Sequence, residues 1–120
     1  MLAFNVSFKF FPQITAHENG QCVVYDVSAR KPVSTFQPHS MDCRSIRFSP
    51  DSKYVLTGSY DANIALTAVQ YNLDTKTQPQ SQIVATHKDK VIQCRWHPSQ
   101  YTFLSSSADK TAALWTQEES

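Results

Sequence analysis

The chain has 120 residues and a formal net charge of +1, from 11 Lys and Arg residues against 10 Asp and Glu residues. This balance gives no electrostatic reason to expect a nucleic acid or an acidic membrane surface as a partner. Hydrophobic residues make up 41% of the chain and charged residues 18%, which excludes a disordered polymer and indicates a soluble globular protein.

The sequence also carries information about the compartment of the protein. No apolar run approaches the length of about 18 residues that a membrane-spanning helix needs. The first residues contain neither a basic leader nor a small-residue cleavage site, so we expect no signal peptide and a cytoplasmic location. The three cysteines, Cys22, Cys43 and Cys94, are far apart at apolar strand positions, which predicts small core residues in a reducing compartment.

The first strands are predicted within residues 1–37, a degenerate first unit. Leu2–Val6 has the weakest pattern of the four segments expected there. Gln13–His17 and Gln21–Asp26 are predicted strands, and the Asn-Gly pair between them suits a turn with positive φ. Val33–Gln37 is the expected outer strand, and the Lys-Pro pair before it is typical of an exposed edge.

A second unit is predicted over residues 38–86. Its first strand begins near Cys43, and Ser49–Ser52 has the composition of a turn. Residues 70–81 are polar, contain one Pro and are long for a hairpin connection, so we expect a mobile loop there.

A third unit is predicted over residues 87–116, followed by a tail at 117–120. Its strands are Val91–Trp96, Thr102–Ser107 and Thr111–Thr116, which are rich in β-branched and aromatic residues. The four residues that follow are too few for a fourth strand. This unit is therefore expected to lack its outer strand.

The second and third units are copies of one pattern. A shift of 48 residues superimposes residues 87–115 on residues 39–67 without a gap. The identical pairs across this shift include His39 and His87, Arg47 and Arg95, Pro50 and Pro98, Leu56 and Leu104, Ser59 and Ser107, Asp61 and Asp109, and Leu66 and Leu114.

A further shift of 42 residues extends the repeat into the first unit, where Ile14 aligns with Leu56 and Asn19 with Asp61. A period of 42 to 48 residues with about four short strands is typical of a β-propeller blade. We therefore predict an all-β fold with three blades of four-stranded antiparallel sheet. Since propellers have four to eight blades, three form only a partial ring, completed by further blades or by a second copy of the chain.

The motif residues identify the family. The chain resembles the WD-repeat proteins, which have a His before the first strand of a blade, a Ser-x-Asp turn and a Trp-Asp pair near the end of the third strand. The resemblance implies that the His bonds to the Asp and the Ser of the turn and that the Trp N–H completes the network. In the second unit Thr67 replaces the Trp. The implied structural network consists of His39, Ser59, Asp61, His87, Ser107, Asp109 and Trp115.

The same residue types occur in hydrolases, as a Ser-His-Asp set. No Gly-x-Ser-x-Gly nucleophile motif is present, so we predict that the chain is not an enzyme and needs no cofactor. Cys94 and His97 have the spacing of a zinc-binding pair, but no second close pair exists, and no metal site is predicted.

The remaining function is binding through the surface. In the WD-repeat family the partner surface is mostly formed by the loops that enter each blade and by the turns between second and third strands. Lys88, Lys90 and Tyr60 could also contact RNA, but with Asp89 among them we do not expect a nucleic acid partner. The predicted protein-binding residues are Glu18, Ser40, Asp42, Tyr60, Lys88, Asp89 and Lys90.

A finer resemblance suggests a cellular role. The segments HKDKVIQCRWH and FLSSSAD, together with RFSPDSKYVLTGSYD, are similar to the last blades of a WD-repeat neuronal microtubule-associated protein. This similarity implies a scaffold within a longer protein, tied to the cytoskeleton through microtubule-associated proteins. The alternative is a WD-repeat subunit of another complex, such as a ubiquitin-ligase adaptor or an RNA-processing factor.

Overall fold

The computed structural model describes residues 2–4, 12–26, 30–51, 53–69 and 79–116. These residues form three antiparallel sheets, each built from strands that follow one another in the chain. The first sheet has the strands β1 (Leu2–Phe4), β2 (Pro12–Ala16), β3 (Cys22–Asp26) and β4 (Lys31–Phe36). The second has β5 (Cys43–Phe48), β6 (Val55–Ser59), β7 (Asn63–Thr67) and β8 (Ser81–Thr86). The third has β9 (Val91–Trp96), β10 (Thr102–Ser107) and β11 (Ala112–Thr116).

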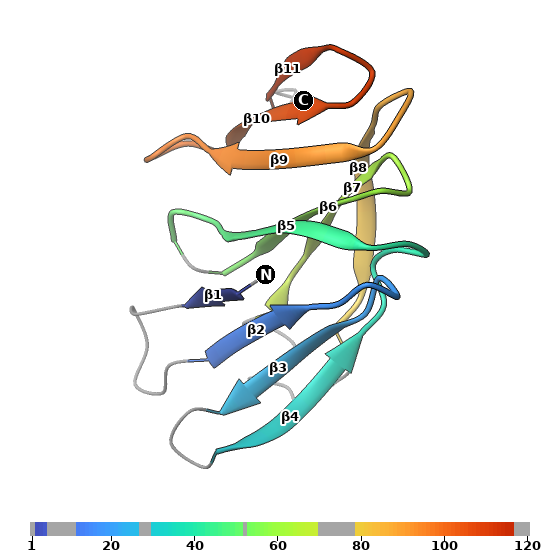
Figure 1. Ribbon diagram of the computed structural model, residues 1–120. Coiled ribbons are helices and arrows are strands. Elements are labelled where there is room, and N and C mark those ends of the chain that lie inside the picture. Colours follow the sequence, from blue (N-terminus) through green and yellow to red (C-terminus); the bar gives the residue numbers. More distant parts are fainter. Residues whose placement is uncertain (1, 5–11, 27–29, 52, 70–78, 117–120) are drawn as a thin grey trace.

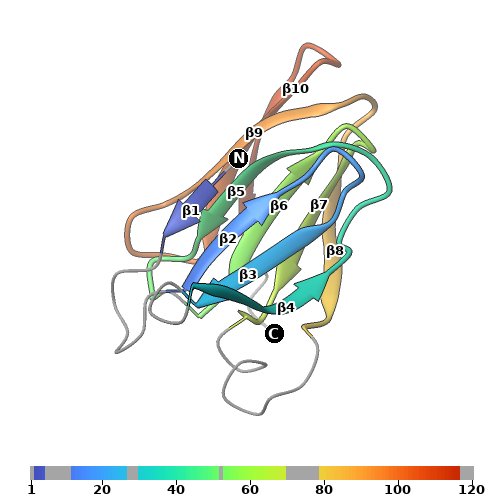
Figure 2. The same cartoon turned by 60° about the horizontal axis from the view of Figure 1, so that its bottom comes forward.

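The sheets are stacked in chain order, from the blue strands to the orange and red ones in Figure 1. Figure 2 shows the same stack from a direction in which β1, β5 and β9 lie toward one side and β4 and β8 toward the other. Within the described residues the stack is open, and no strand pairs with the outer edge of β11. The predicted all-β arrangement of partial propeller blades is therefore confirmed.

Most strand positions match the expectation, but the outer strand of the first sheet begins earlier. β4 starts at Lys31 and includes Pro32, which lies opposite Tyr25 in the register with β3. Proline has no N–H to donate, and an edge strand tolerates this because one of its sides needs no partner. The register shifts between Val24 and Tyr25, next to this proline. Most of the loop expected at residues 70–81 lies outside the described residues, and β8 already begins at Ser81.

The inner strands of the middle sheet pack against a neighbouring sheet on each face. All five residues of β6 are buried, and side chains on alternate sides of the strand enter two different cores. Val55 packs into the core shared with the first sheet, whereas Leu56 packs into the core shared with the third. The core between the first two sheets contains Ile14, Cys22, Val24, Phe36, Cys43, Ile46, Val55 and Val69. The second core contains Leu56, Ile64, Ala85, Val91, Cys94 and Phe103.

The repeat places equivalent apolar residues on the same face of every sheet. Ile14 and Leu56 are 0% exposed because the next sheet covers them, whereas the equivalent Leu104 is 53% exposed. Leu114 on β11 is 68% exposed, although its equivalent Leu66 is packed against the second core. The outward face of the third sheet is therefore a packing face that no described residue covers.

Gly58 provides a test of how closely the second and third sheets pack. A Cβ atom added at this position would lie 2.7 Å from Cγ1 of Val91 on β9. We expect Gly58→Ala to lower the free energy of unfolding by about 1–3 kcal/mol, as overpacking does in other cores. Chemical denaturation of the chain measures this change.

A double substitution supplies the control. Val91→Ala removes the atom that the new methyl group would meet, so Gly58→Ala should cost less in the Val91→Ala background than in the wild type. Strictly additive effects of the two substitutions would show that the sheets do not meet at this point.

Candidate functional site

His87 lies at the centre of a hydrogen-bonded network at one end of the third sheet. Its Nδ1 is 3.2 Å from a carboxylate oxygen of Asp109, and its Nε2 is 2.7 Å from Oγ of Ser105. The indole N–H of Trp115 donates to the same Ser105 oxygen at 2.8 Å. The rings of His87 and Trp115 meet edge to face.

These contacts define a direction for the hydrogen bonds. A carboxylate accepts only, so Nδ1 of His87 carries the proton and donates to Asp109. With a single ring proton, at Nδ1, Nε2 accepts from the Ser105 hydroxyl, whose oxygen in turn accepts from Trp115. Each polar group in this buried chain has a partner, which satisfies the usual requirement for buried polar atoms.

Asp109 also holds the turn between β10 and β11. Its carboxylate accepts from the backbone N–H of Lys88 at 3.1 Å and of Thr111 at 2.9 Å, and from the hydroxyl of Thr111. The pKa of Asp109 is held below its ordinary value, mainly by the hydrogen bond from the Thr111 hydroxyl and further by the two backbone N–H groups and His87. The turn closes through Lys110, which has a positive φ of 70°.

The second sheet repeats this network with different residues. Nδ1 of His39 lies 3.1 Å from a carboxylate oxygen of Asp61, and Nε2 lies 2.8 Å from the hydroxyl of Thr57. The Asp61 carboxylate accepts from the backbone N–H of Ser40 and of Asn63. The His39 side chain is fully buried, and this burial lowers its pKa, while the nearby Asp61 acts in the opposite direction.

The hydroxyl that contacts each histidine is not the expected one. Ser107 was expected to bond His87, but the hydroxyl at Nε2 belongs to Ser105; likewise Thr57 takes the place expected for Ser59. Because side chains alternate across a strand, residues two apart lie on one face at successive positions, and motif spacing alone did not distinguish them. Thr57 and Ser105 each lie 18 residues after a histidine, at aligned positions of the repeat, and both carry a hydroxyl group. This shared hydroxyl is the sequence signal for the role.

Thr67 does not take over the role of Trp115 in the second sheet. Its hydroxyl lies 2.7 Å from that of Ser81 on the neighbouring strand β8. Thr57 therefore has no indole donor, and its second contact is with the carbonyl oxygen of Ala65 at 3.5 Å. In the first unit, His17 is exposed and lies 2.9 Å from the hydroxyl of Thr15, so it forms no such buried network.

Ser59 and Ser107 perform a different task, which is to fix the turns to the loops that enter the sheets. The Ser107 hydroxyl lies 2.9 Å from the carbonyl oxygen of Lys90, and the Ser59 hydroxyl lies 2.9 Å from that of Asp42. Each serine oxygen also accepts a backbone N–H, from Asp109 and from Asp61 respectively. The two serines thus join each turn to the start of the first strand of its sheet.

Backbone hydrogen bonds extend this order from sheet to sheet. Cys43 N–H, at the start of the second sheet, donates to the carbonyl of His17 in the first, and His87 N–H, ahead of the third sheet, donates to that of Ala62 in the second. Within the second and third sheets, Tyr60 N–H donates to the carbonyl of Asp42 and Ala108 N–H to that of Lys90. The loops concerned lie along one edge of the molecule, at the right of Figure 1. We call this row the loop surface, and it comprises residues 17–20, 39–42, 60–62, 87–90 and 108–110.

Two cations lie against the ring of Tyr60 on the loop surface. Cζ of Arg44 and Nζ of Lys90 are each 5.3 Å from the centroid of its ring. Tyr60 was expected to be an exposed aromatic residue, but it is only partly exposed because these side chains cover it. Cation–π contacts at exposed sites contribute about 0.5–1 kcal/mol, enough to orient the ring.

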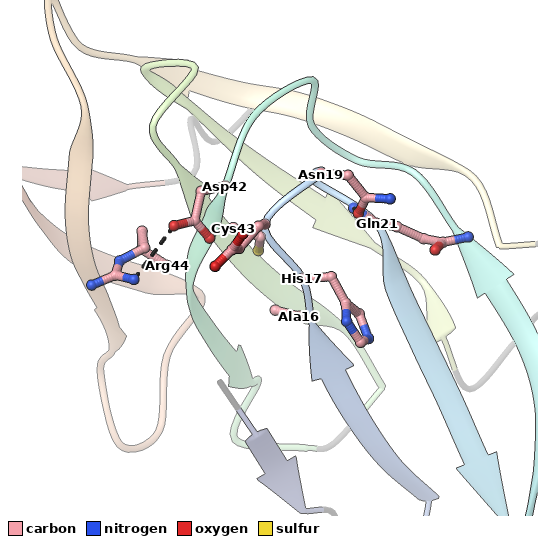
Figure 3. Close-up of a pocket in the computed structure, with 8 residues that line it drawn as sticks. Ala16, His17, Asn19, Gln21, Asp42, Cys43 and Arg44 are labelled. Carbon is pink, nitrogen blue, oxygen red and sulfur yellow. Dashed lines mark hydrogen bonds and ion pairs between the residues drawn. The ribbon is translucent and has the colours of Figure 1, made fainter.

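An open polar pocket of about 810 Å³ lies where the loop surface passes from the first sheet to the second. Figure 3 shows His17, Asn19 and Gln21 on one side and Asp42 and Arg44 on the other. Asp42 and Arg44 are joined by an ion pair of 3.4 Å. The predicted binding residue Glu18 also lines this pocket.

The Ser105–His87–Asp109 set has the connectivity of a hydrolase triad but not its accessibility. Ser105 is 1% exposed, so a substrate carbonyl has no access to its oxygen. That oxygen also accepts the Trp115 N–H, which draws electron density away from it. The arrangement therefore stabilises the blade and offers no nucleophile.

The part of the chain that the structure describes contains no group of three or more His, Cys, Asp or Glu side chains that could hold a metal ion. His97 is exposed, whereas Cys94 is buried, so this pair does not meet at one site. None of the described residues belongs to a helix that is long and apolar enough to cross a membrane.

The comparison with known families agrees with this geometry. The family model "WD domain, G-beta repeat" matches residues 30–66 and 78–116, more than half of the chain, and the chain belongs to this family. Each match runs from the outer strand of one sheet through the first three strands of the next. One repeat in the sequence therefore links two sheets in space.

Curated relatives share this part of their sequence with the chain. Actin-interacting protein 1 of Drosophila melanogaster is 29% identical over 108 residues, which cover 90% of this chain and 17% of that protein. Elongator complex protein 2 of Arabidopsis thaliana is 28% identical over 96 residues, which cover 79% of this chain and 12% of that protein. Guanine nucleotide-binding protein subunit beta of Zea mays is 25% identical over 104 residues, 85% of this chain and 27% of that protein. The chain thus spans only a small part of each relative.

Ser105 offers a direct test of the network. Ser105→Ala leaves the buried Trp115 N–H and the Nε2 of His87 without their partner, and we expect it to lower the free energy of unfolding by about 1–3 kcal/mol. Ser105→Thr should be far less costly, because Thr57 fills the same role in the second sheet. Thermal or chemical denaturation measures both. Equal losses for the two variants would contradict the assigned role of the hydroxyl.

His39 predicts how stability depends on pH. Its folded pKa lies below the ordinary value of 6.5, so near and below pH 6.5 the unfolded state binds more protons than the folded state. The contribution of neutral His39 to the free energy of unfolding is complete above pH 6.5, and it is lost as the pH falls through the pKa of His39 in the folded state. Denaturation at pH 7.5, 6.5 and 5.5 should show a decrease that His39→Gln reduces, while His97→Gln, at an exposed turn position, serves as the control. A decrease of the same size in His39→Gln would refute this assignment.

Proposed function

We propose that the chain is a non-catalytic scaffold that binds protein partners through the loop surface. The observation that carries this proposal is the row of hydrogen bonds that joins successive loops across all three sheets. A surface whose loops are already ordered loses little conformational entropy on binding, which favours recognition.

The predicted binding residues fit this role by position. The backbone N–H groups of Ser40 and Lys88 are bound to the turn carboxylates, which leaves both side chains exposed on the loop surface. Asp89 and Lys90 follow in the same loop and are exposed. A partly covered aromatic ring among charged residues, as at Tyr60, is typical of a binding hot spot.

We also propose that the chain is part of a longer WD-repeat protein. The support is the apolar outward face of the third sheet, with Leu104 and Leu114 exposed, and the greater length of the relatives. Further blades, or a second copy of this chain, would cover that face.

The cellular role that we propose is cytoskeletal. Residues 87–97 and 103–109 resemble the last blades of nemitin, a neuronal microtubule-associated WD-repeat protein, and one relative bears the name actin-interacting protein 1. Partners would then be microtubule-associated proteins in the cytoplasm. The name of another relative, Elongator complex protein 2, supports the alternative of a subunit in a different multiprotein complex.

Co-sedimentation tests the cytoskeletal proposal. The purified chain should not pellet with microtubules made of tubulin alone, because it carries a net charge of only +1. It should pellet when a fraction of neuronal microtubule-associated proteins is added. Tyr60→Ala should reduce the pelleted fraction severalfold, by removing the aromatic side chain from the loop surface.

Val33→Ser is the matched control, because Val33 is an exposed residue on β4 away from the loop surface. It should pellet like the wild type. If the wild-type chain stays in the supernatant with the added fraction, the microtubule role is wrong. If Tyr60→Ala and Val33→Ser pellet equally, binding does not use the loop surface.

A further inference from the structure

The charged groups of Arg44 and Lys90, beside Tyr60, can form further hydrogen bonds and ion pairs with a partner molecule. Arg44 forms one ion pair, with Asp42 at 3.4 Å, and its side chain is 52% exposed. Among the described residues Lys90 forms no ion pair, and its side-chain nitrogen contacts the Tyr60 ring. An exposed ion pair of this kind is weak, so a competing anion can share the Arg44 guanidinium at little cost.

The fold brings these two cations from neighbouring sheets to one aromatic ring. Arg44 belongs to β5, and Lys90 directly precedes β9, the first strand of the next sheet. Tyr60 is bonded through its backbone to Asp42, and Lys90 accepts a backbone bond from Ala108. With each cation 5.3 Å from the ring centroid, the two lie within one small patch that spans the second and third sheets.

We propose that this patch binds a carboxylate side chain of an acidic segment in a protein partner, placed between Arg44 and Lys90 against the ring of Tyr60. This inference rests on the proposed scaffold function and adds the chemistry of the partner. A guanidinium and an ammonium group that lie against one ring can each form a charge-assisted hydrogen bond with a carboxylate. The aromatic ring beside them supplies an apolar surface for the methylene groups of a glutamate.

The charge of the patch favours a carboxylate over a phosphate. Arg44, Lys88 and Lys90 are positive, while Asp42 and Asp89 are negative and lie in the same loops. The sum is one positive charge, which matches a group with one negative charge. A phosphate with nearly two charges would meet stronger repulsion from the two aspartates.

Isothermal titration of the 120-residue chain with a hexaglutamate peptide tests this proposal. Arg44→Gln combined with Lys90→Gln should weaken binding at least fivefold, and Tyr60→Leu should weaken it as well, while Tyr60→Phe retains the ring and the affinity. The control is Lys31→Gln combined with Lys53→Gln, which removes the same charge from exposed positions elsewhere and should bind within twofold of the wild type.

The outcomes separate the alternatives. Equal weakening in the test and control pairs would mean that bulk charge alone attracts the peptide, and the proposal would be wrong. Tighter binding of a hexaphosphoserine peptide than of hexaglutamate would overturn the carboxylate assignment in favour of phosphate. A dispersed amide spectrum of each variant excludes unfolding as the cause, and peptide-induced shifts at residues 42–44, 60 and 90 locate the site.

The same variants keep this inference distinct from the scaffold function. In one outcome, the Arg44→Gln, Lys90→Gln double variant still pellets with the microtubule-associated fraction, and hexaglutamate does not bind the wild type. The scaffold function then stands and the acidic partner is excluded. If hexaglutamate binds as expected but the wild type recruits nothing from the fraction, the partner chemistry stands and the proposed cellular role fails.

Discussion

The order of the loop surface depends on the histidine that precedes the first strand of the second sheet and of the third sheet. His87 donates its backbone N–H to Ala62 in the turn of the second sheet, while its ring bonds Asp109 in the turn of the third. One residue therefore joins two sheets and closes a turn. Its partners are buried or nearly so, and a lost bond would leave a polar group without water or protein to satisfy it. This asymmetry makes the network a strong constraint on the positions of the loops.

The order of the loop surface also depends on the packing of the middle sheet. Its inner strands contribute to the cores on both sides, and this sets the distance between adjacent sheets that the loops have to span. Val55 and Leu56, neighbours on β6, enter different cores, so the strand has no solvent-facing side. Between the inner strands, the Ser45 hydroxyl accepts the Cys94 N–H at 3.1 Å, and the Trp96 indole N–H donates to the Arg47 carbonyl at 3.2 Å. Apolar burial brings the sheets together, and these few polar contacts set their register.

Function follows from this division between a rigid interior and an ordered edge. The interior holds Ser105 and His87 away from solvent, which leaves the serine oxygen out of reach of a substrate. The edge exposes charged side chains whose backbones are held by hydrogen bonds. The repeat supplies the frame, and the residues that differ between repeats, such as Tyr60 against Ala108 and Asp42 against Lys90, give the surface its individual character.

The sequence by itself determined the all-β class, the three repeating units and most strands and turns, because these depend on local alternation, turn residues and a fixed repeat length. The histidine–aspartate pairs came from the resemblance of the motifs to the WD-repeat family. The positive φ expected at the Asn-Gly turn is present at Gly20, at 84°. Only the tertiary structure decided that Ser105 and Thr57 contact the histidines, and that Arg44 and Lys90 lie against the ring of Tyr60. Those contacts depend on which face of a strand meets which neighbour and on how adjacent sheets are stacked. Residues far apart in the chain set both, and no local pattern records them.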